Sequence, residues 1–159
     1  AVRFQYKFAI GAILALVHDV IVTVGFFSVF GFEFDLTVLA AVMAIIGYSI
    51  NDTIVVFDRV RENFRLLRKA DSLEVFNVSM TQTLERTIIT GLTVILVLIA
   101  LFYVGGEAIH NFSIAMLVGV GFGIYSSVYV ASSLALSTGI VREDLLPTPK
   151  EADERNLLP

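Results

Sequence analysis

The chain has 159 residues, of which 57% are hydrophobic and only 16% are charged, and its mean hydropathy is +0.84. Soluble domains carry about a quarter charged residues, so this composition excludes a soluble globular protein and indicates a polytopic membrane protein. The chain has a net charge of −4 and contains no cysteine, which excludes disulfides and thiolate metal sites.

Four apolar segments are long enough to cross the hydrocarbon core of a bilayer, which takes roughly 17–25 helical residues. They are residues 8–30, 36–57, 87–104 and 109–136. Backbone polar groups find no water within lipid, so each segment must be a helix. The sequence therefore predicts an all-α fold, a polytopic membrane helix bundle with four transmembrane helices.

The remaining segments are polar. We expect residues 1–139 to form the transmembrane domain and residues 140–159, which are charged and carry prolines, to be a disordered cytoplasmic tail. Within the loop at residues 58–86, apolar residues recur at helical spacing between arginines, which predicts short cytoplasmic helices lying on the membrane surface. Residues 71–74 resemble a capping box that starts the second of them. A basic connector is the simpler interpretation of this loop, and a docking surface for a partner is the alternative.

The lysines and arginines lie on one side of the predicted bundle. The turns at residues 31–35 and 105–107 contain none, whereas the two ends of the chain and the segment 58–86 carry all of them. Cytoplasmic loops are enriched in Lys and Arg, so we expect both termini of this chain and the central loop to be cytoplasmic.

The first span contains a carboxylate, Asp19, directly after His18. At a rise of 1.5 Å per residue, Asp19 lies about 16 Å beyond residue 8, near the middle of the membrane. A charge at this depth costs roughly 3 kcal/mol on insertion scales. A stripe of small and polar residues runs along the same helix face, so the acid should face other helices. It is either a structural hydrogen-bonding group between helices or part of a proton pathway.

The second span contains Asn51 and Asp52, and Asp52 lies about 24 Å along the helix, in the cytoplasmic third of the bilayer. Ser49 shares the face of Asp52, whereas Asn51 points about 100° away. Arg86, at the start of the third span, lies at a similar depth, and pairing it with Asp52 would lower the cost of both charges. The alternative for Arg86 is snorkelling to lipid headgroups.

The fourth span carries small residues at every fourth position. This seam predicts close helix packing and is formed by Gly119, Gly123, Ser127, Ala131 and Ala135. A nucleotide-binding glycine loop is excluded here, because no strand precedes the glycines.

Two intramembrane protease sites can be considered and are disfavoured. Ser49 with His18 lacks the glycine that follows the nucleophile in serine protease motifs, and Asp19 and Asp52 lack the flanking residues of aspartyl proteases. We therefore expect no catalytic residue, and no cofactor or metal site.

Several motifs together are similar to one family. They are the run 47–53 with residues 57–63, the pair at 18–19, the run 83–87 and the run 126–132. These motifs resemble the SecF signature of the SecD/SecF family, bacterial protein-export membrane proteins of the resistance–nodulation–division superfamily. The resemblance covers nearly the whole chain. Residues 90–94 depart from it, because many members carry more hydroxyls there.

The resemblance implies a function and partners. The chain would be the C-terminal transmembrane part of an auxiliary subunit of the Sec translocase, located in the bacterial inner membrane, which uses the proton motive force with SecD to promote protein export. Asp52 and Arg86 would conduct protons, with Asp19 and Asn51 as further candidates, and an acid of SecD would complete the path. The expected partners are SecD, the Sec channel with its associated subunits, the translocating polypeptide and lipids, but no nucleic acid.

Two other functions remain open. The chain could be half of a proton-driven small-molecule efflux transporter of the same superfamily, or a structural membrane scaffold without ion traffic. The signature around Asn51 and Asp52 favours the export function over the efflux transporter, and proton-dependent activity would separate both from a scaffold.

Overall fold

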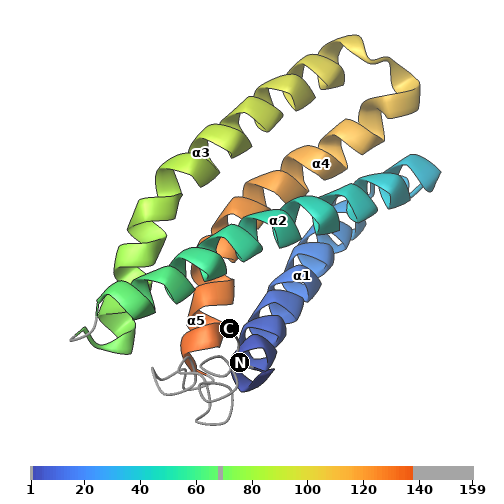
Figure 1. The fold of residues 1–159 in the computed structure, drawn as a ribbon. Coiled ribbons are helices and arrows are strands. Elements are labelled where there is room, and N and C mark those ends of the chain that lie inside the picture. The colour runs from blue at the N-terminus through green and yellow to red at the C-terminus, as the bar shows by residue number, and fades with distance from the viewer. Residues whose placement is uncertain (1, 68–69, 138–159) are drawn as a thin grey trace, which may run out of the picture.

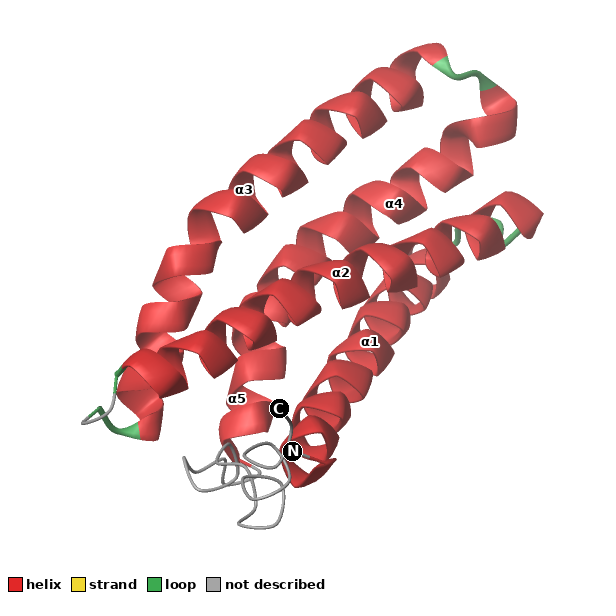
Figure 2. Ribbon diagram, viewed as in Figure 1, coloured by secondary structure: helices red, strands yellow, loops and turns green. Residues whose placement is uncertain are grey.

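The computed structural model describes residues 2–67 and 70–137, so the tail expected at 140–159 lies outside the described residues. Every regular element of this part is a helix, which confirms the all-α prediction (Figure 2). The elements are α1 (Val2–Phe30), α2 (Leu36–Leu66), α3 (Ser72–Val104), α4 (Glu107–Tyr125), the π-helix η1 (Ser126–Val130) and α5 (Ala131–Ser137).

The helices form an elongated bundle (Figure 1). The elements α4, η1 and α5 follow one another without a gap as one helical member, which bends between α4 and α5 (Figure 1), so the bundle has four long members. Each member contains a stretch long and apolar enough to span a membrane, within Phe8–Phe30, Leu36–Leu66, Ser72–Val104 and Glu107–Ser137. The chain is therefore a multi-pass membrane protein.

The turns at residues 31–35 and 105–106 lie at one end of the bundle, and the turn between α2 and α3 lies at the other (Figure 1). Gly31 and Gly106 have φ angles of +69° and +74°, a conformation that only glycine adopts without strain. Asp35 caps α2, because its carboxylate accepts hydrogen bonds from the Val38 amide at 2.9 Å and the Thr37 hydroxyl at 2.7 Å.

The segment 58–86 differs from the expectation. It does not form short helices of its own, because α2 continues to Leu66 and α3 begins at Ser72. No glycine or proline occurs between residues 48 and 90, so nothing interrupts either helix. α3 begins at the expected capping segment, where the Asp71 carboxylate accepts a hydrogen bond from the Ser72 amide at 2.7 Å.

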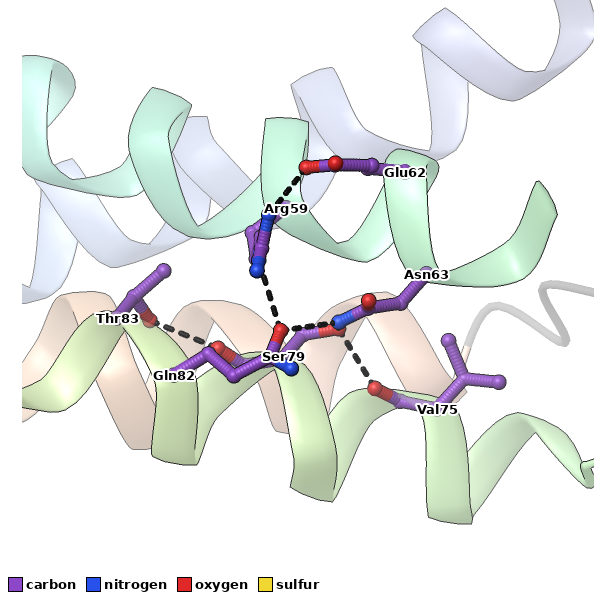
Figure 3. A network of polar contacts seen from close by, with 7 residues as sticks. All are labelled: Arg59, Glu62, Asn63, Val75, Ser79, Gln82 and Thr83. Atoms are coloured by element: carbon purple, nitrogen blue, oxygen red, sulfur yellow. Dashed lines mark hydrogen bonds and ion pairs between the residues drawn. The ribbon is translucent and has the colours of Figure 1, made fainter. Parts of the chain in front are cut away.

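At the loop end, α2 and α3 are joined by a cross-helix network that we call the hairpin latch, formed by Arg59, Asn63, Ser79 and Gln82 (Figure 3). The Asn63 amide donates to the Ser79 hydroxyl and to the Gln82 carbonyl oxygen, both at 2.8 Å. The Arg59 Nε donates to the same Gln82 oxygen at 2.7 Å. These bonds hold the two helix ends in one register.

Two apolar clusters fill the bundle. One lies near the loop end around Phe57, Phe64 and Phe76, and the other lies near the short turns around Phe27 and Ile45. On every long member, buried polar residues lie in sequence between the positions that contribute to the two clusters. The bundle therefore contains a polar layer between two apolar ones.

Candidate functional site

The polar layer contains two buried acids and the hydroxyls around them. Its buried residues are Asp19, Thr23, Ser49, Asp52, Thr53, Thr83, Thr87, Ser126 and Ser127. Buried polar groups need hydrogen-bond partners, and an isolated buried charge is far more costly than a buried hydroxyl. The partners of the two acids therefore determine what the layer can do.

Asp52 projects from α2 into the bundle, and its side chain is 6% exposed. Its two carboxylate oxygens accept one hydrogen bond each, from the Thr87 hydroxyl of α3 and from the Ser127 hydroxyl of η1, both at 3.0 Å. No arginine or lysine in the described part of the chain forms an ion pair with Asp52. The carboxylate is thus held by three helices through neutral hydroxyls.

The π-helix η1 brings Ser127 to Asp52. A π-helical turn holds one residue more than an α-helical turn, and such turns often occur at functional sites. The Ser127 Oγ also lies 3.2 Å from the carbonyl oxygen of Ile124. A serine hydroxyl has one proton to donate and two lone pairs to accept with. Ser127 can therefore donate to an ionised Asp52, or accept from a protonated one while donating to Ile124.

Asp19 forms a second acid site, one helical turn away along α2. Its side chain is 1% exposed, and it accepts a hydrogen bond of 2.6 Å from the Ser49 hydroxyl of α2. The His18 Nδ1 lies 3.1 Å from the other carboxylate oxygen. Ser49 and Asp52 are three residues apart on one face of α2, or about 4.5 Å along the axis. The two acid sites therefore share α2 as a common wall.

Arg86 and Asn51 lie outside this arrangement. The side chain of Arg86 is exposed, so the ion pair expected between Arg86 and Asp52 is not present, and Thr87 occupies the position facing the acid. Neighbouring residues on a helix point about 100° apart, so with Thr87 facing the acid the Cα–Cβ bond of Arg86 points away from it, and only a turn of its long side chain would bring the guanidinium toward Asp52. Asn51 is exposed on the outer face of α2 together with Gly47.

The small residues of the fourth long member lie against this site. Gly119 is packed on Ile45, and a Cβ added at Gly123 would lie 3.9 Å from a carboxylate oxygen of Asp19. Ala131 is fully buried, and its carbonyl oxygen would lie 3.1 Å from a Cβ added at Gly11 of α1. The seam thus lets α4 approach both acid-bearing helices closely.

Sequence reasoning assigned Ser127 to packing alone and gave Thr87 no role toward Asp52. One available signal was their placement. Thr87 is next to Arg86 at the depth of Asp52, and Ser127 is one turn beyond Gly123 on a face that must be buried. The hydrogen bond from Ser127 to Asp52 depends on η1, and no residue pattern in the sequence predicts a π-helix there.

Fold and site define a multi-pass helical membrane protein with two buried acids in an internal polar layer. The profile of the family described as "Protein export membrane protein SecD/SecF, C-terminal" matches residues 1–140. The chain therefore belongs to the SecD/SecF family.

Relatives named protein translocase subunit SecF are similar over nearly the whole chain. Identity is 53% to that of Haemophilus influenzae, 57% to that of Pseudomonas aeruginosa and 50% to that of Escherichia coli O157:H7, over 96%, 91% and 99% of this chain. The matches cover 47%, 47% and 50% of those proteins, so the chain spans about half the length of the curated relatives it matches.

A solved structure has the same fold. A crystal structure of SecDF in the super-membrane-facing form matches with a TM-score of 0.82 and 41% sequence identity, over 99% of this chain and 20% of that one. The arrangement of helices described above is thus that of a segment of SecDF.

Proposed function

We propose that this chain is the C-terminal transmembrane part of an auxiliary subunit of the Sec translocase, which uses the proton motive force to promote protein export. The family supports the export function, since relatives of 50–57% identity are named translocase subunits. The similarity to SecDF supports a SecD-like partner. The Sec channel with its associated subunits, the translocating polypeptide and lipids complete the proposed set of partners.

The observation that carries the proton-handling role is the environment of Asp52. Two hydroxyls and no cation contact the carboxylate in the described part of the chain. Hydroxyls can serve both charge states of an acid, because they donate to a carboxylate and accept from a carboxylic acid. A structural ion pair would instead fix the acid in its ionised form. Asp52 is therefore suited to bind and release a proton without losing its contacts to these two hydroxyls.

The other candidates take supporting roles. Asp19, with Ser49 as its hydroxyl partner, is a second acid at which a proton can reside. Arg86 lies beside the Thr87 that binds Asp52, so a change of its side-chain direction would bring a guanidinium toward the acid and favour proton release. Asn51 faces outward at the same level, and a polar amide at this depth favours contact with a partner helix over contact with lipid.

The test is translocation into inverted membrane vesicles, with and without a proton gradient, using the full-length protein and its partner. Asp52→Asn keeps the size of the side chain and removes the titration, so we expect it to abolish the gradient-dependent part of translocation and preserve complex assembly. Asp71→Asn, the same change at the exposed cap of α3, is the matched control and should behave as wild type. If Asp52→Asn retained full gradient stimulation, Asp52 would be structural, and Asp19 would be tested next.

We also propose that the chain lies in the bacterial inner membrane with both of its termini in the cytoplasm. The one-sided placement of Lys and Arg supports this orientation. Single cysteines at positions 65 and 107 can be labelled with an impermeant thiol reagent in cells with a permeabilised outer membrane. Labelling is expected at 107 and not at 65, and the reverse result would invert the topology.

A further inference from the structure

A further acid of α2, Asp58, lies six residues, or about 9 Å, from Asp52 toward the loop end. A crevice of about 340 Å³ opens between α2 and α3, and both Asp58 and Arg86 line it. Both side chains are exposed, and neither forms an ion pair with a residue in the described ranges. Two opposite charges thus share one crevice with neither neutralised by another group.

The remaining charges of the crevice are already engaged. Arg59 donates a hydrogen bond to Glu62, one helical turn away on α2, and its Nε donates to Gln82 of α3 (Figure 3). This leaves Asp58 as the acid available to Arg86 within the crevice. On its opposite side, Asp58 lines a second crevice of about 240 Å³ between α1 and α2, together with Arg61. Arg61 is therefore the competing cation, and it lies 5.8 Å above the ring of Phe8.

The register of α2 against α3 places Arg86 between the two acids. The hydrogen bonds from Thr87 to Asp52 and from Arg59 to Gln82 show which residues of the two antiparallel helices lie level. Interpolating between these contacts puts Arg86 level with about residue 53 of α2. At 1.5 Å per residue, both Asp52 and Asp58 then lie within about 7 Å of that level along the axis. A long arginine side chain can turn toward either acid.

We propose that Asp58 is the alternative partner of Arg86: the guanidinium binds Asp58 in the crevice when Asp52 is protonated, and leaves it for Asp52 when Asp52 is ionised. Asp58 is then a positioning residue that acts on Asp52 through Arg86. The inference rests on the proposed proton-handling role of Asp52. When Asp52 is protonated it offers the arginine no counter-charge. Asp58 would then serve as the binding partner of the Arg86 guanidinium during that part of the cycle.

Translocation by the full-length protein with its partner tests the functional side. Asp58→Asn should reduce the gradient-dependent component by a factor of about 1.4 to 5, which corresponds to the loss of an exposed ion pair. Asp58→Glu keeps the charge and should restore most of it. Glu62→Gln removes the same charge from the same crevice, but at an acid engaged with Arg59, so it is the matched control and should leave the component unchanged. Equal effects of Asp58→Asn and Glu62→Gln would overturn the proposal.

A double-mutant cycle on thermal stability tests the pairing independently of proton transport. In the Asp52→Asn background, which mimics the protonated acid, Asp58→Asn should lower the midpoint temperature, and adding Arg86→Gln should abolish that shift. With Asp52 intact the coupling should be smaller. Absence of coupling in both backgrounds, or coupling of Asp58 to Arg61 in place of Arg86, would refute the switch.

The two failures are distinguishable. If Asp52→Asn retains gradient stimulation while the coupling between Asp58 and Arg86 still depends on residue 52, the proposed function is wrong and the alternation of the arginine stands. If Asp52→Asn loses the stimulation and no coupling is found, the proposed function stands and the inference about Asp58 is wrong.

Discussion

Among the glycines in the described part of the chain, Gly119 of α4 has the least room for a side chain. A Cβ built there would lie 2.1 Å from the Cδ1, 2.5 Å from the Cγ1 and 3.0 Å from the Cγ2 of Ile45, a side chain that is 1% exposed. Rotating the end of the isoleucine would relieve the first contact and leave the last. Ile is stiff at χ1, so Gly119→Ala must push Ile45 off its rotamer or separate α2 from α4.

The expected magnitude follows from two opposing terms. Overpacking a well-packed core costs about 1–3 kcal/mol. Alanine recovers about 1 kcal/mol relative to glycine in a helix interior. Gly121→Ala, two residues on, gains the same propensity at an exposed site with no atom within 4 Å of the added Cβ. Gly119→Ala should therefore be less stable than Gly121→Ala by about 1–3 kcal/mol, the steric cost alone.

The measurement is reversible unfolding in mixed micelles, with the full-length protein. Ile45→Ala supplies a second arm, because it leaves a cavity at the site of the clash, at a cost of about 2–5 kcal/mol. In that background the Gly119→Ala methyl enters the cavity, so the substitution should become neutral or stabilising. If Gly119→Ala matched Gly121→Ala, or if its effect had the same sign in both backgrounds, the packing of α4 on α2 described here would be wrong.

Two further predictions concern the helix ends. Asn63→Ala removes two hydrogen bonds of the hairpin latch, one buried and one partly buried, and should lower the free energy of unfolding by about 1–3 kcal/mol, whereas Thr81→Ala, which loses an exposed bond within its own helix, should change it by about 0.5 kcal/mol or less. The hydroxyl of Thr37 and then the amide of Val38 hold the pKa of Asp35 below its usual value of 3.8. The cap is therefore complete above that pH and is lost as the pH falls through the lowered pKa, so the protection of the Val38 amide against exchange, measured relative to its intrinsic exchange rate, should fall there; the same loss of protection in Asp35→Asn would contradict this assignment.

The four membrane-spanning helices could be predicted from the sequence because the solvent around them is lipid. Lipid forces each long apolar segment into a helix, so the four members could be derived from hydropathy alone, before any tertiary contact was known. The ends of the helices could not, because outside the lipid nothing in hydropathy says where a helix stops. α2 and α3 each extend into the charged segment, where no Gly or Pro interrupts them, and that absence was the better signal.

The site was predictable in its acids and less so in their partners. Asp19 and Asp52 were found because a carboxylate within an apolar span must be explained. Opposite charges at equal depth suggested Arg86 as the partner of Asp52, but depth does not fix the angular position of a side chain. A rotation of about 100° between neighbours gave Thr87 the inward place. The extra residue of η1, which brings Ser127 to Asp52, has no signature in residue type or spacing.

The α2–α3 hairpin is long enough to amplify a small tilt near Asp52 into a larger displacement at its end. α2 and α3 have 31 and 33 residues, or about 46 and 50 Å, against a hydrocarbon core of about 30 Å. From Asp52 to the end of α2 at Leu66 the helix extends about 21 Å, so a tilt of about 10° at the level of the acid would displace the tip by about 4 Å. The hairpin latch makes the two helix ends move together. A change too small to break the packing around Asp52 would thus displace the basic end of the hairpin by about two-thirds of the rise of one helical turn.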